Sequence, residues 1–270
     1  MDVLQAIILG LIQGLTEFLP VSSSGHLEIG KAIMGLEANA PLGFTLLLHG
    51  ATLLSTLVAL WREIWGLCTG FFKFGKSWEF SYVLKIVVSM LPIALVGLLF
   101  RAQVEELFKG NLLLVGCMLL LTAVLLFLAY RLPGLLRARR QAAAPAGGVS
   151  YCAALLMGVG QAFAALPGLS RSGTTISLGL LGGLKQEDAA RFSFLMVLPP
   201  IIGANILDLL DPSTSLQGLS LAALMAGFLT AFLSGYVACR LMLKVIRRKG
   251  FLGFSIYCAI VGAIAIIYAL

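Results

Sequence analysis

Long apolar stretches separated by short polar or basic segments dominate this chain. The longest lie near 42–61, 82–100, 111–130, 190–210, 218–239 and 251–270. Each approaches the roughly 20 residues that a helix needs to cross a bilayer. Strand-like alternation is not present, and a lipid-facing backbone must satisfy its own hydrogen bonds, so helix is the predicted state. The pattern therefore predicts an all-α polytopic membrane protein with about six transmembrane helices.

Two further regions, 1–40 and 151–188, break this pattern in the same way. Each has an apolar run too short for a comfortable span, then a turn rich in Pro, Ser and Gly, then a second short apolar piece. The second region repeats the first 148 positions later, and a gapless overlay pairs Gly10 with Gly158, Gln13 with Gln161, Ser22 with Ser170, Ser24 with Ser172 and Gly25 with Gly173. We expect two re-entrant helical hairpins that meet in the middle of the membrane, because matched interruptions in two halves are typical of a site at a repeat interface.

The domain organisation follows from this repeat and from the basic residues. One integral membrane domain is predicted, with a first repeat over 1–130, a basic linker over 131–150 and a second repeat over 151–270. Lys and Arg gather in that linker and in 62–81 and 240–250, which the positive-inside rule places in the cytoplasm. The first hairpin then opens outward and the second opens inward, so the two repeats have inverted topology.

Composition supports a membrane protein and excludes other classes. Of the 270 residues, 60% are hydrophobic and 11% charged, against roughly 25% charged in a soluble domain, and the mean hydropathy is +1.01. The net charge of +7 is spread over the predicted cytoplasmic loops, so it signals topology and no nucleic-acid partner is expected. The five cysteines are scattered without paired spacing, which speaks against a disulfide framework or a metal cluster.

The first hairpin carries an unusual set of polar side chains for a membrane segment. Gln13 and Glu17 are four residues apart and share one helix face. An ionisable group at membrane depth indicates function, although a carboxylate that only caps a turn or pairs with a cation is the alternative. Ser22, Ser23, Ser24 and His26 follow within nine residues and offer hydroxyls, backbone N–H groups and an imidazole at a helix start. Such turns bind anions, although an ordinary serine N-cap is the commoner use of any single serine.

The second hairpin repeats the serines and adds a cation. Arg171 lies between Ser170 and Ser172, and its guanidinium can grip a phosphate with two parallel hydrogen bonds. A purely structural partner for Glu17 is the alternative for this arginine. The two copies differ where chemistry would differ, because Glu17 and His26 face Ala165 and Thr174, whereas Arg171 faces Ser23. The sequence therefore predicts one shared site.

These motifs resemble a known family. Gln13-Gly-Leu-Thr-Glu17-Phe-Leu-Pro-Val-Ser-Ser-Ser-Gly-His26 resembles the Glu/Gln-x-x-x-Glu signature of bacterial undecaprenyl-diphosphatases of the bacitracin-resistance type. Pro167-Gly-Leu-Ser-Arg-Ser-Gly-Thr-Thr175 fits that family's Pro-Gly-x-Ser-Arg-Ser-x-x-Thr signature at every fixed position. The resemblance covers the whole chain. It implies a phosphatase that converts undecaprenyl diphosphate to the monophosphate and inorganic phosphate, recycles the carrier for wall synthesis and confers bacitracin resistance. The expected location is the bacterial cytoplasmic membrane, with the site facing outward.

The same resemblance, joined to the residue chemistry, gives expected roles. Glu17, Ser23, His26 and Arg171 are the expected catalytic residues, with Ser23 or a water as nucleophile and His26 as general acid or base. Glu17 and phosphate oxygens are expected to hold Mg²⁺ or Ca²⁺. The expected phosphate-binding set is Gln13, Ser22, Ser24, Gly168, Ser170, Ser172, Thr174 and Thr175. For His49, inside an apolar run, packing or hydrogen bonding is favoured over support of the site.

A secondary transporter or flippase for a phosphate-bearing solute or lipid is the alternative function, because inverted repeats with broken helices are also the architecture of transporters. Such a carrier would also bind phosphate through an arginine and serines, but it does not need the Glu, Ser and His set that catalysis would use. The expected partners are a prenyl diphosphate lipid and the bilayer, and oligomeric state stays open, with a homodimer among the options.

Overall fold

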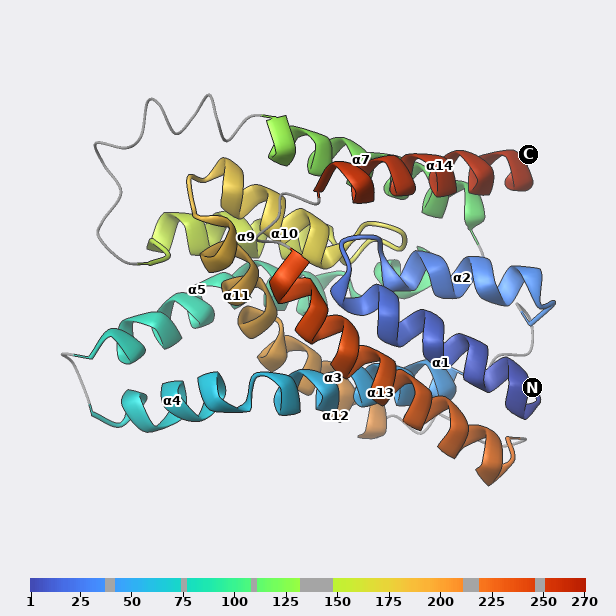
Figure 1. Ribbon diagram of the computed structural model, residues 1–270, viewed down its shortest axis with the longest axis horizontal. Helices are drawn as coiled ribbons and strands as arrows, with labels where there is room; N and C mark the ends of the chain where they lie inside the picture. The colour runs from blue at the N-terminus through green and yellow to red at the C-terminus, as the bar shows by residue number, and fades with distance from the viewer. Residues whose placement is uncertain (37–41, 74–76, 108–110, 132–147, 211–218, 246–250) are drawn as a thin grey trace.

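The computed structural model describes residues 1–36, 42–73, 77–107, 111–131, 148–210, 219–245 and 251–270, and these contain helices and no strands. In chain order the helices are α1 (Val3–Phe18), α2 (Ser23–Ile33), α3 (Leu42–Ala59), α4 (Trp61–Phe71), α5 (Trp78–Leu99), α6 (Arg101–Leu107), α7 (Leu112–Arg131), α9 (Tyr151–Phe163), α10 (Arg171–Leu181), α11 (Gln186–Met196), α12 (Leu198–Leu210), α13 (Leu221–Val245) and α14 (Phe251–Ala269). Figure 1 shows them as a bundle whose long helices run mostly along its longest axis.

The predicted spans are present. Among the described residues, α5, α7, the combined α11–α12, α13 and α14 are long and apolar enough to cross a membrane, which gives five candidates. A sixth is the pair α3 and α4, which are bent by 73° at the break after Ala59. The prediction of an all-α polytopic membrane protein is confirmed.

Two of these spans differ in detail from the sequence prediction. The segment after 61 was expected to be a loop, but it forms α4, whose tryptophans Trp61 and Trp65 are exposed and stacked. A short helix that mixes exposed tryptophans with charged Arg62 and Glu63 is typical of the membrane interface. The span near 190–210 is interrupted at Val197, where two consecutive prolines, beginning at Pro199, open the first turn of α12 and remove backbone donors.

Both predicted hairpins consist of two short helices joined by a tight turn. In Figure 1, α1 runs inward from the end that holds both termini and α2 returns to it, whereas α9 and α10 enter from the opposite end. The two turns meet in the middle of the bundle. The boundaries of the two repeats and of the linker stay a prediction, and most of the linker lies outside the described residues.

Each hairpin is held by a span from the other half of the chain. Helix α1 packs on α13, and α9 packs on α5. The paired glycines lie at these two crossings: a Cβ at Gly10 would come within 2.6 Å of the Gly227 carbonyl oxygen, and one at Gly158 within 2.3 Å of the Ser89 carbonyl oxygen. Small residues that let backbones approach closely are a common means of helix association in membranes. The repeat thus preserves its packing contacts as well as its turns.

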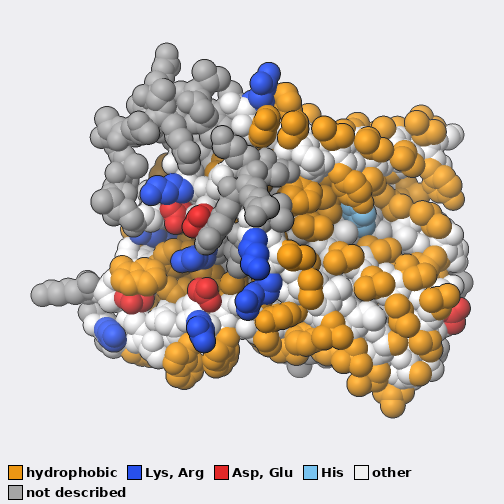
Figure 2. Space-filling model, viewed as in Figure 1, with side chains coloured by type: hydrophobic (Ala, Val, Ile, Leu, Met, Phe, Trp, Pro, Cys, Tyr) orange, Lys and Arg blue, Asp and Glu red, His pale blue; other side chains and the backbone are white. Residues whose placement is uncertain are grey.

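The surface separates charged from apolar side chains. Figure 2 shows Lys and Arg gathered toward the end where α4 lies, whereas hydrophobic side chains dominate the rest of that face. Helices α7 and α14 lie side by side along one edge (Figure 1) and pack extensively together. The exposed apolar side chains of the long helices are those that a bilayer would cover.

Candidate active site

The turns of the two hairpins touch and hydrogen-bond to each other. The Gly168 N–H donates to Ser24 Oγ at 3.4 Å, and Ser172 Oγ donates to the Leu19 carbonyl at 3.2 Å. The approach is close enough that a Cβ at Gly25 would lie 3.1 Å from the Cα of Gly168. Residues more than 140 positions apart in the sequence are therefore fixed beside one another, as the shared site requires.

Local sequence explains how each turn presents its side chains. Pro20 follows the end of α1, and Ser22 then adopts a left-handed φ of 71°, which few non-glycine residues do. Its hydroxyl accepts from the Gly25 N–H at 3.2 Å and caps α2. Such backbone strain is commonly retained at functional sites. The result is that Ser23 becomes the first residue of α2.

The second turn has the same design with different residues. Gly168 supplies the left-handed conformation at φ 90°, and Ser170 caps α10 by accepting from the Gly173 N–H at 3.1 Å. Arg171 is then the first residue of α10. Ser23 and Arg171, paired in the repeat, thus occupy the same position at two helix starts that face each other.

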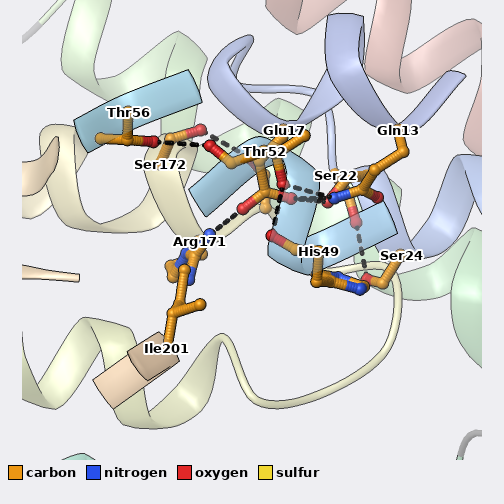
Figure 3. A network of polar contacts seen from close by, with 12 residues as sticks. Gln13, Glu17, Ser22, Ser24, His49, Thr52, Thr56, Arg171, Ser172 and Ile201 are labelled. Atoms are coloured by element: carbon orange, nitrogen blue, oxygen red, sulfur yellow. Dashed lines mark hydrogen bonds and ion pairs between the residues drawn. The ribbon is translucent and has the colours of Figure 1, made fainter. Parts of the chain in front are cut away.

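Glu17 joins these two positions (Figure 3). Its Oε1 pairs with Arg171 Nη2, and its Oε2 accepts from Ser23 Oγ at 2.5 Å and from Gln13 Nε2 at 3.0 Å. The carboxylate side chain is 7% exposed and the guanidinium side chain 27%. The structural pairing of Arg171 with Glu17, left open by the sequence, is present. It still leaves donors for a phosphate, because a guanidinium carries five N–H groups.

Helix α3 contributes polar groups near Glu17, of which the sequence reasoning named only His49. Gln13 Nε2 also donates to Thr52 Oγ1 at 3.3 Å, and His49 Nδ1 donates to the Thr45 carbonyl at 2.9 Å. Figure 3 shows His49, Thr52 and Thr56 around Glu17. With Thr45 they fall at steps of four, three and four residues, which is one face of a helix. That polar stripe inside an apolar span was the available signal.

An amphipathic pocket opens beside Glu17 and Arg171. Its polar lining consists of Glu17, Thr52, Thr56, Arg171, Ser172 and Ser193, and its apolar lining of Phe18, Leu53, Phe194, Val197 and Ile201. Ser193 was not foreseen, although its position on α11 pairs with Thr45 in the repeat. A pocket with a charged end and an apolar wall suits a ligand that is itself a charged head on a hydrocarbon chain.

Five of the predicted site residues lie at or beside this pocket. Glu17, Arg171 and Ser172 line it, and Gln13 and Ser23 hydrogen-bond to Glu17. Ser22 and Ser24 lie within 3.3 Å of each other in the first turn. His26 contacts the Ser22 carbonyl and the Tyr257 hydroxyl and does not line the pocket.

The remaining predicted residues support the second hairpin. Ser170 accepts from Gly173, and its N–H donates to Thr122 on α7. Thr175 donates to the Arg171 carbonyl at 2.8 Å and lies 2.7 Å from Ser193 Oγ. Thr174 is buried, and its hydroxyl has no hydrogen-bond partner among the described residues. Its methyl group lies against Gly160 instead of facing the pocket.

The fit of these residues to a divalent cation rests on oxygen donors. Across the described residues, no three His, Cys, Asp or Glu side chains cluster as a metal site. Glu17 supplies a carboxylate, and beside it the buried Gln13 Oε1 has no hydrogen-bond partner among the described residues. Magnesium typically binds through one or two carboxylates together with substrate phosphates and water. The donor set therefore fits an ion completed mainly by its substrate.

Comparison with known proteins agrees with the geometry. Residues 6–264 match the family described as bacitracin resistance protein BacA. An undecaprenyl-diphosphatase of Bacteroides fragilis (strain YCH46) is 47% identical, covering 99% of this chain and 98% of its own length. One of Christiangramia forsetii is 48% identical, with 100% and 99% covered. One of Halothermothrix orenii is 37% identical, with 100% and 99% covered.

Proposed function

Because the chain belongs to the bacitracin resistance protein BacA family, we propose that it is an undecaprenyl-diphosphatase. It is a multi-pass membrane protein, and its proposed reaction releases inorganic phosphate from undecaprenyl diphosphate and leaves the monophosphate carrier for peptidoglycan synthesis. The family's description names bacitracin resistance, and the same property is proposed for this chain. The amphipathic pocket supports this substrate class, since the diphosphate can lie at Arg171 and the prenyl chain against the apolar wall.

The observation that carries the proposal is the hydrogen bond from Ser23 to Glu17, with Glu17 paired to Arg171. A hydroxyl that donates to a carboxylate is arranged as a nucleophile with its general base. In the proposed reaction Ser23 Oγ attacks the terminal phosphorus while its proton passes to Glu17. The bond from that phosphorus to the bridging oxygen breaks, and undecaprenyl phosphate leaves. Water then hydrolyses the phosphoserine and releases inorganic phosphate.

Arg171 binds the phosphate in this scheme. The terminal phosphoryl group carries charge on its nonbridging oxygens, and a guanidinium stabilises that charge with two parallel hydrogen bonds. In the structure, one nitrogen of the Arg171 guanidinium is paired with Glu17. We expect the incoming phosphate to take over part of this contact, which leaves the Glu17 carboxylate free to accept the proton from Ser23.

A divalent cation is proposed to bind at Glu17 and Gln13 Oε1. Its contribution when bound is to offset negative charge on the phosphate oxygens. Gln13→Glu tests this placement, because a second carboxylate beside Glu17 repels it unless a cation lies between them. We expect this variant to keep activity with added Mg²⁺ or Ca²⁺ and to lose more than the parent chain when a chelator is added.

Phosphate release by purified protein tests the function itself. Detergent-solubilised protein with undecaprenyl or farnesyl diphosphate should release inorganic phosphate, and Ser23→Ala should abolish this. Thr69→Ala is the matched control, because its hydroxyl donates to its own helix on the exposed α4. Acid quenching with substrate labelled at the terminal phosphate should trap label on the parent protein. Full turnover without trapped label, or an active Ser23→Ala protein, would assign the attack to water.

The site is proposed to face the extracytoplasmic side of the cytoplasmic membrane. The basic residues at the α4 end mark the cytoplasm, so the hairpin that carries Glu17 and Ser23 enters from outside. Single cysteines in a cysteine-free background test it, at the exposed Glu106 on the α6 side and the exposed Arg62 on α4. An impermeant thiol reagent on intact cells should label position 106 and spare position 62. The reverse labelling contradicts the proposed sidedness.

A further inference from the structure

The His26 imidazole is held at both of its nitrogen atoms. Nδ1 lies 2.8 Å from the Ser22 carbonyl oxygen, and Nε2 lies 2.8 Å from the hydroxyl of Tyr257 on α14. The two rings are also stacked, with centroids 5.5 Å apart and an angle of 7° between planes. His26 is therefore fixed in position and in orientation by a residue 231 positions away.

These two contacts determine which ring nitrogen carries the proton. A backbone carbonyl can only accept a hydrogen bond, so Nδ1 must be protonated and donate to Ser22. In the neutral ring Nε2 is then an acceptor, and the Tyr257 hydroxyl donates to it. Tyr257 is 43% exposed on the apolar outer surface, where lipid offers its hydroxyl no alternative acceptor. The hydrogen bond to His26 is thus favoured by the surroundings of both partners.

Tyr257 is itself anchored to the first hairpin turn. Its neighbour Cys258 donates from Sγ to the Pro20 carbonyl at 3.6 Å, inside that turn. Two residues before Tyr257, Ser255 donates to the Ala123 carbonyl of α7 at 2.7 Å. Helix α14 is therefore fastened to α7 and to the turn on either side of Tyr257, so the tyrosine has little freedom to move away from His26.

We propose that Tyr257 is a positioning residue of the active site: its hydroxyl holds His26 in the Nδ1–H tautomer, so that His26 fixes the Ser22 carbonyl and with it the Ser23 nucleophile. Ser22 has the left-handed φ of 71°, and Ser23 follows it directly at the start of α2. A restraint on the Ser22 carbonyl stabilises this strained turn from outside the pocket. The effect on turnover rests on the proposed phosphatase function, whereas the tautomer of His26 rests on the geometry alone.

This arrangement changes the role expected of His26. Direct proton transfer at Nε2 would first require Tyr257 to release that nitrogen, whereas Ser23 already has Glu17 as its acceptor. The structure assigns His26 to the geometry of the turn, in the manner of a group that orients a reacting neighbour. Tyr257 extends that support to the C-terminal helix, a region in which the sequence motifs gave no site residue.

The chain contains only two histidines, so the tautomer can be measured directly. Protein labelled with ¹⁵N-histidine in detergent or lipid discs should show His26 as a single Nδ1–H tautomer in its ¹⁵N shifts, with the two rings assigned by removing each histidine in turn. Tyr257→Phe keeps the stacked ring and removes only the hydroxyl. In this variant the Nε2–H tautomer should appear as well.

Kinetics on the same proteins give the functional reading. Tyr257→Phe should lower kcat by about fivefold to tenfold, the loss of one hydrogen bond, while KM changes little because the pocket is untouched. Tyr268→Phe on the exposed end of the same helix is the control and should match the parent chain.

Three outcomes overturn the proposal. An Nε2–H tautomer in the parent protein contradicts the geometry, whatever the variants do. An unchanged tautomer or unchanged kcat in Tyr257→Phe removes the positioning role. Failure of the parent chain to release phosphate would instead contradict the proposed function, and the tautomer measurement would still report on Tyr257 and His26.

Discussion

The two hairpins have the same backbone design and opposite chemical contents. Both have a buried glutamine, a serine-capped second helix and a glycine at the crossing with a distant span. The first hairpin places the Glu17 carboxylate at the pocket, with Ser23 bonded to it, whereas the second contributes a guanidinium and the Ser172 hydroxyl. Helix α3 adds the Thr52 and Thr56 hydroxyls. Two hairpins of the same design thus contribute complementary parts of one site.

The paired glutamines show how the copies diverged. Gln13 donates to Glu17 and Thr52, and the positions paired with those two partners are Ala165 and Pro200. Gln161 is accordingly buried, and neither its amide nitrogen nor its oxygen has a partner among the described residues. The second hairpin kept the residue and lost its network. The two hairpins therefore share their packing but differ in their chemistry, and substitutions at paired positions can test the two separately.

The largest effect should come from the charges that the copies do not share. Arg171→Ala and Glu17→Gln should each lower kcat by roughly 10³-fold, because each removes a charged group that acts on the transferring phosphoryl or its nucleophile. Arg171→Lys should restore little, since a point charge cannot make two parallel hydrogen bonds. Phosphate release by purified, folded protein is the measurement. Near-normal activity of the lysine variant would show that charge alone suffices.

The next largest effect is a loss of stability that should be equal in the two hairpins. Gly10→Ala and Gly158→Ala each force a Cβ into a backbone carbonyl across a helix crossing, at 2.6 Å and 2.3 Å. Each should cost about 1–3 kcal/mol of stability, as overpacking does. Thermal unfolding in one detergent is the measurement, and Gly203→Ala, which meets nothing within 4 Å, is the control. A large difference between the paired variants would contradict equivalent packing.

Periodicity and the repeat were enough to predict much of this molecule. The apolar stretches gave the spans because bilayer thickness sets helix length, and the paired serines marked the turns because a cap must follow a break. They did not give the bend between α3 and α4 or the interruption at Val197, because the length of an apolar stretch says nothing of a break inside it. The two prolines that begin at Pro199 were the available signal for the second.

The site was predicted less evenly, for a physical reason. Motif residues such as Glu17, Ser23 and Arg171 are polar at membrane depth and therefore stand out in sequence. Thr52 and Thr56 escaped notice because a threonine in a span usually bonds to its own helix, as Thr56 also does here. Tyr257 escaped because its role depends on a contact between distant helices, and no local pattern encodes that.

A moderate effect is expected from the glutamine that kept its network. Gln13→Leu removes donors from Glu17 and Thr52, so the carboxylate loses one of its hydrogen bonds inside the pocket. We expect kcat to fall by about tenfold, in line with the loss of a hydrogen bond to a charged group. Steady-state phosphate release is the measurement. Unchanged kcat would mean that Ser23 and Arg171 alone hold Glu17 in place.

The smallest effect is expected from the glutamine that lost its network. Gln161→Leu at the paired position removes a buried amide that has no described partner, so the substitution should leave activity unchanged and should leave stability unchanged or slightly raised. Thermal unfolding and phosphate release, measured beside Gln13→Leu, form a matched pair because both changes are chemically identical and both sites are buried. A clear loss of stability or of turnover in Gln161→Leu would mean that the Gln161 amide has a binding partner. The α9–α10 interface would then have a polar function of its own. If neither is lost, Gln161 packs in the second hairpin without a polar role.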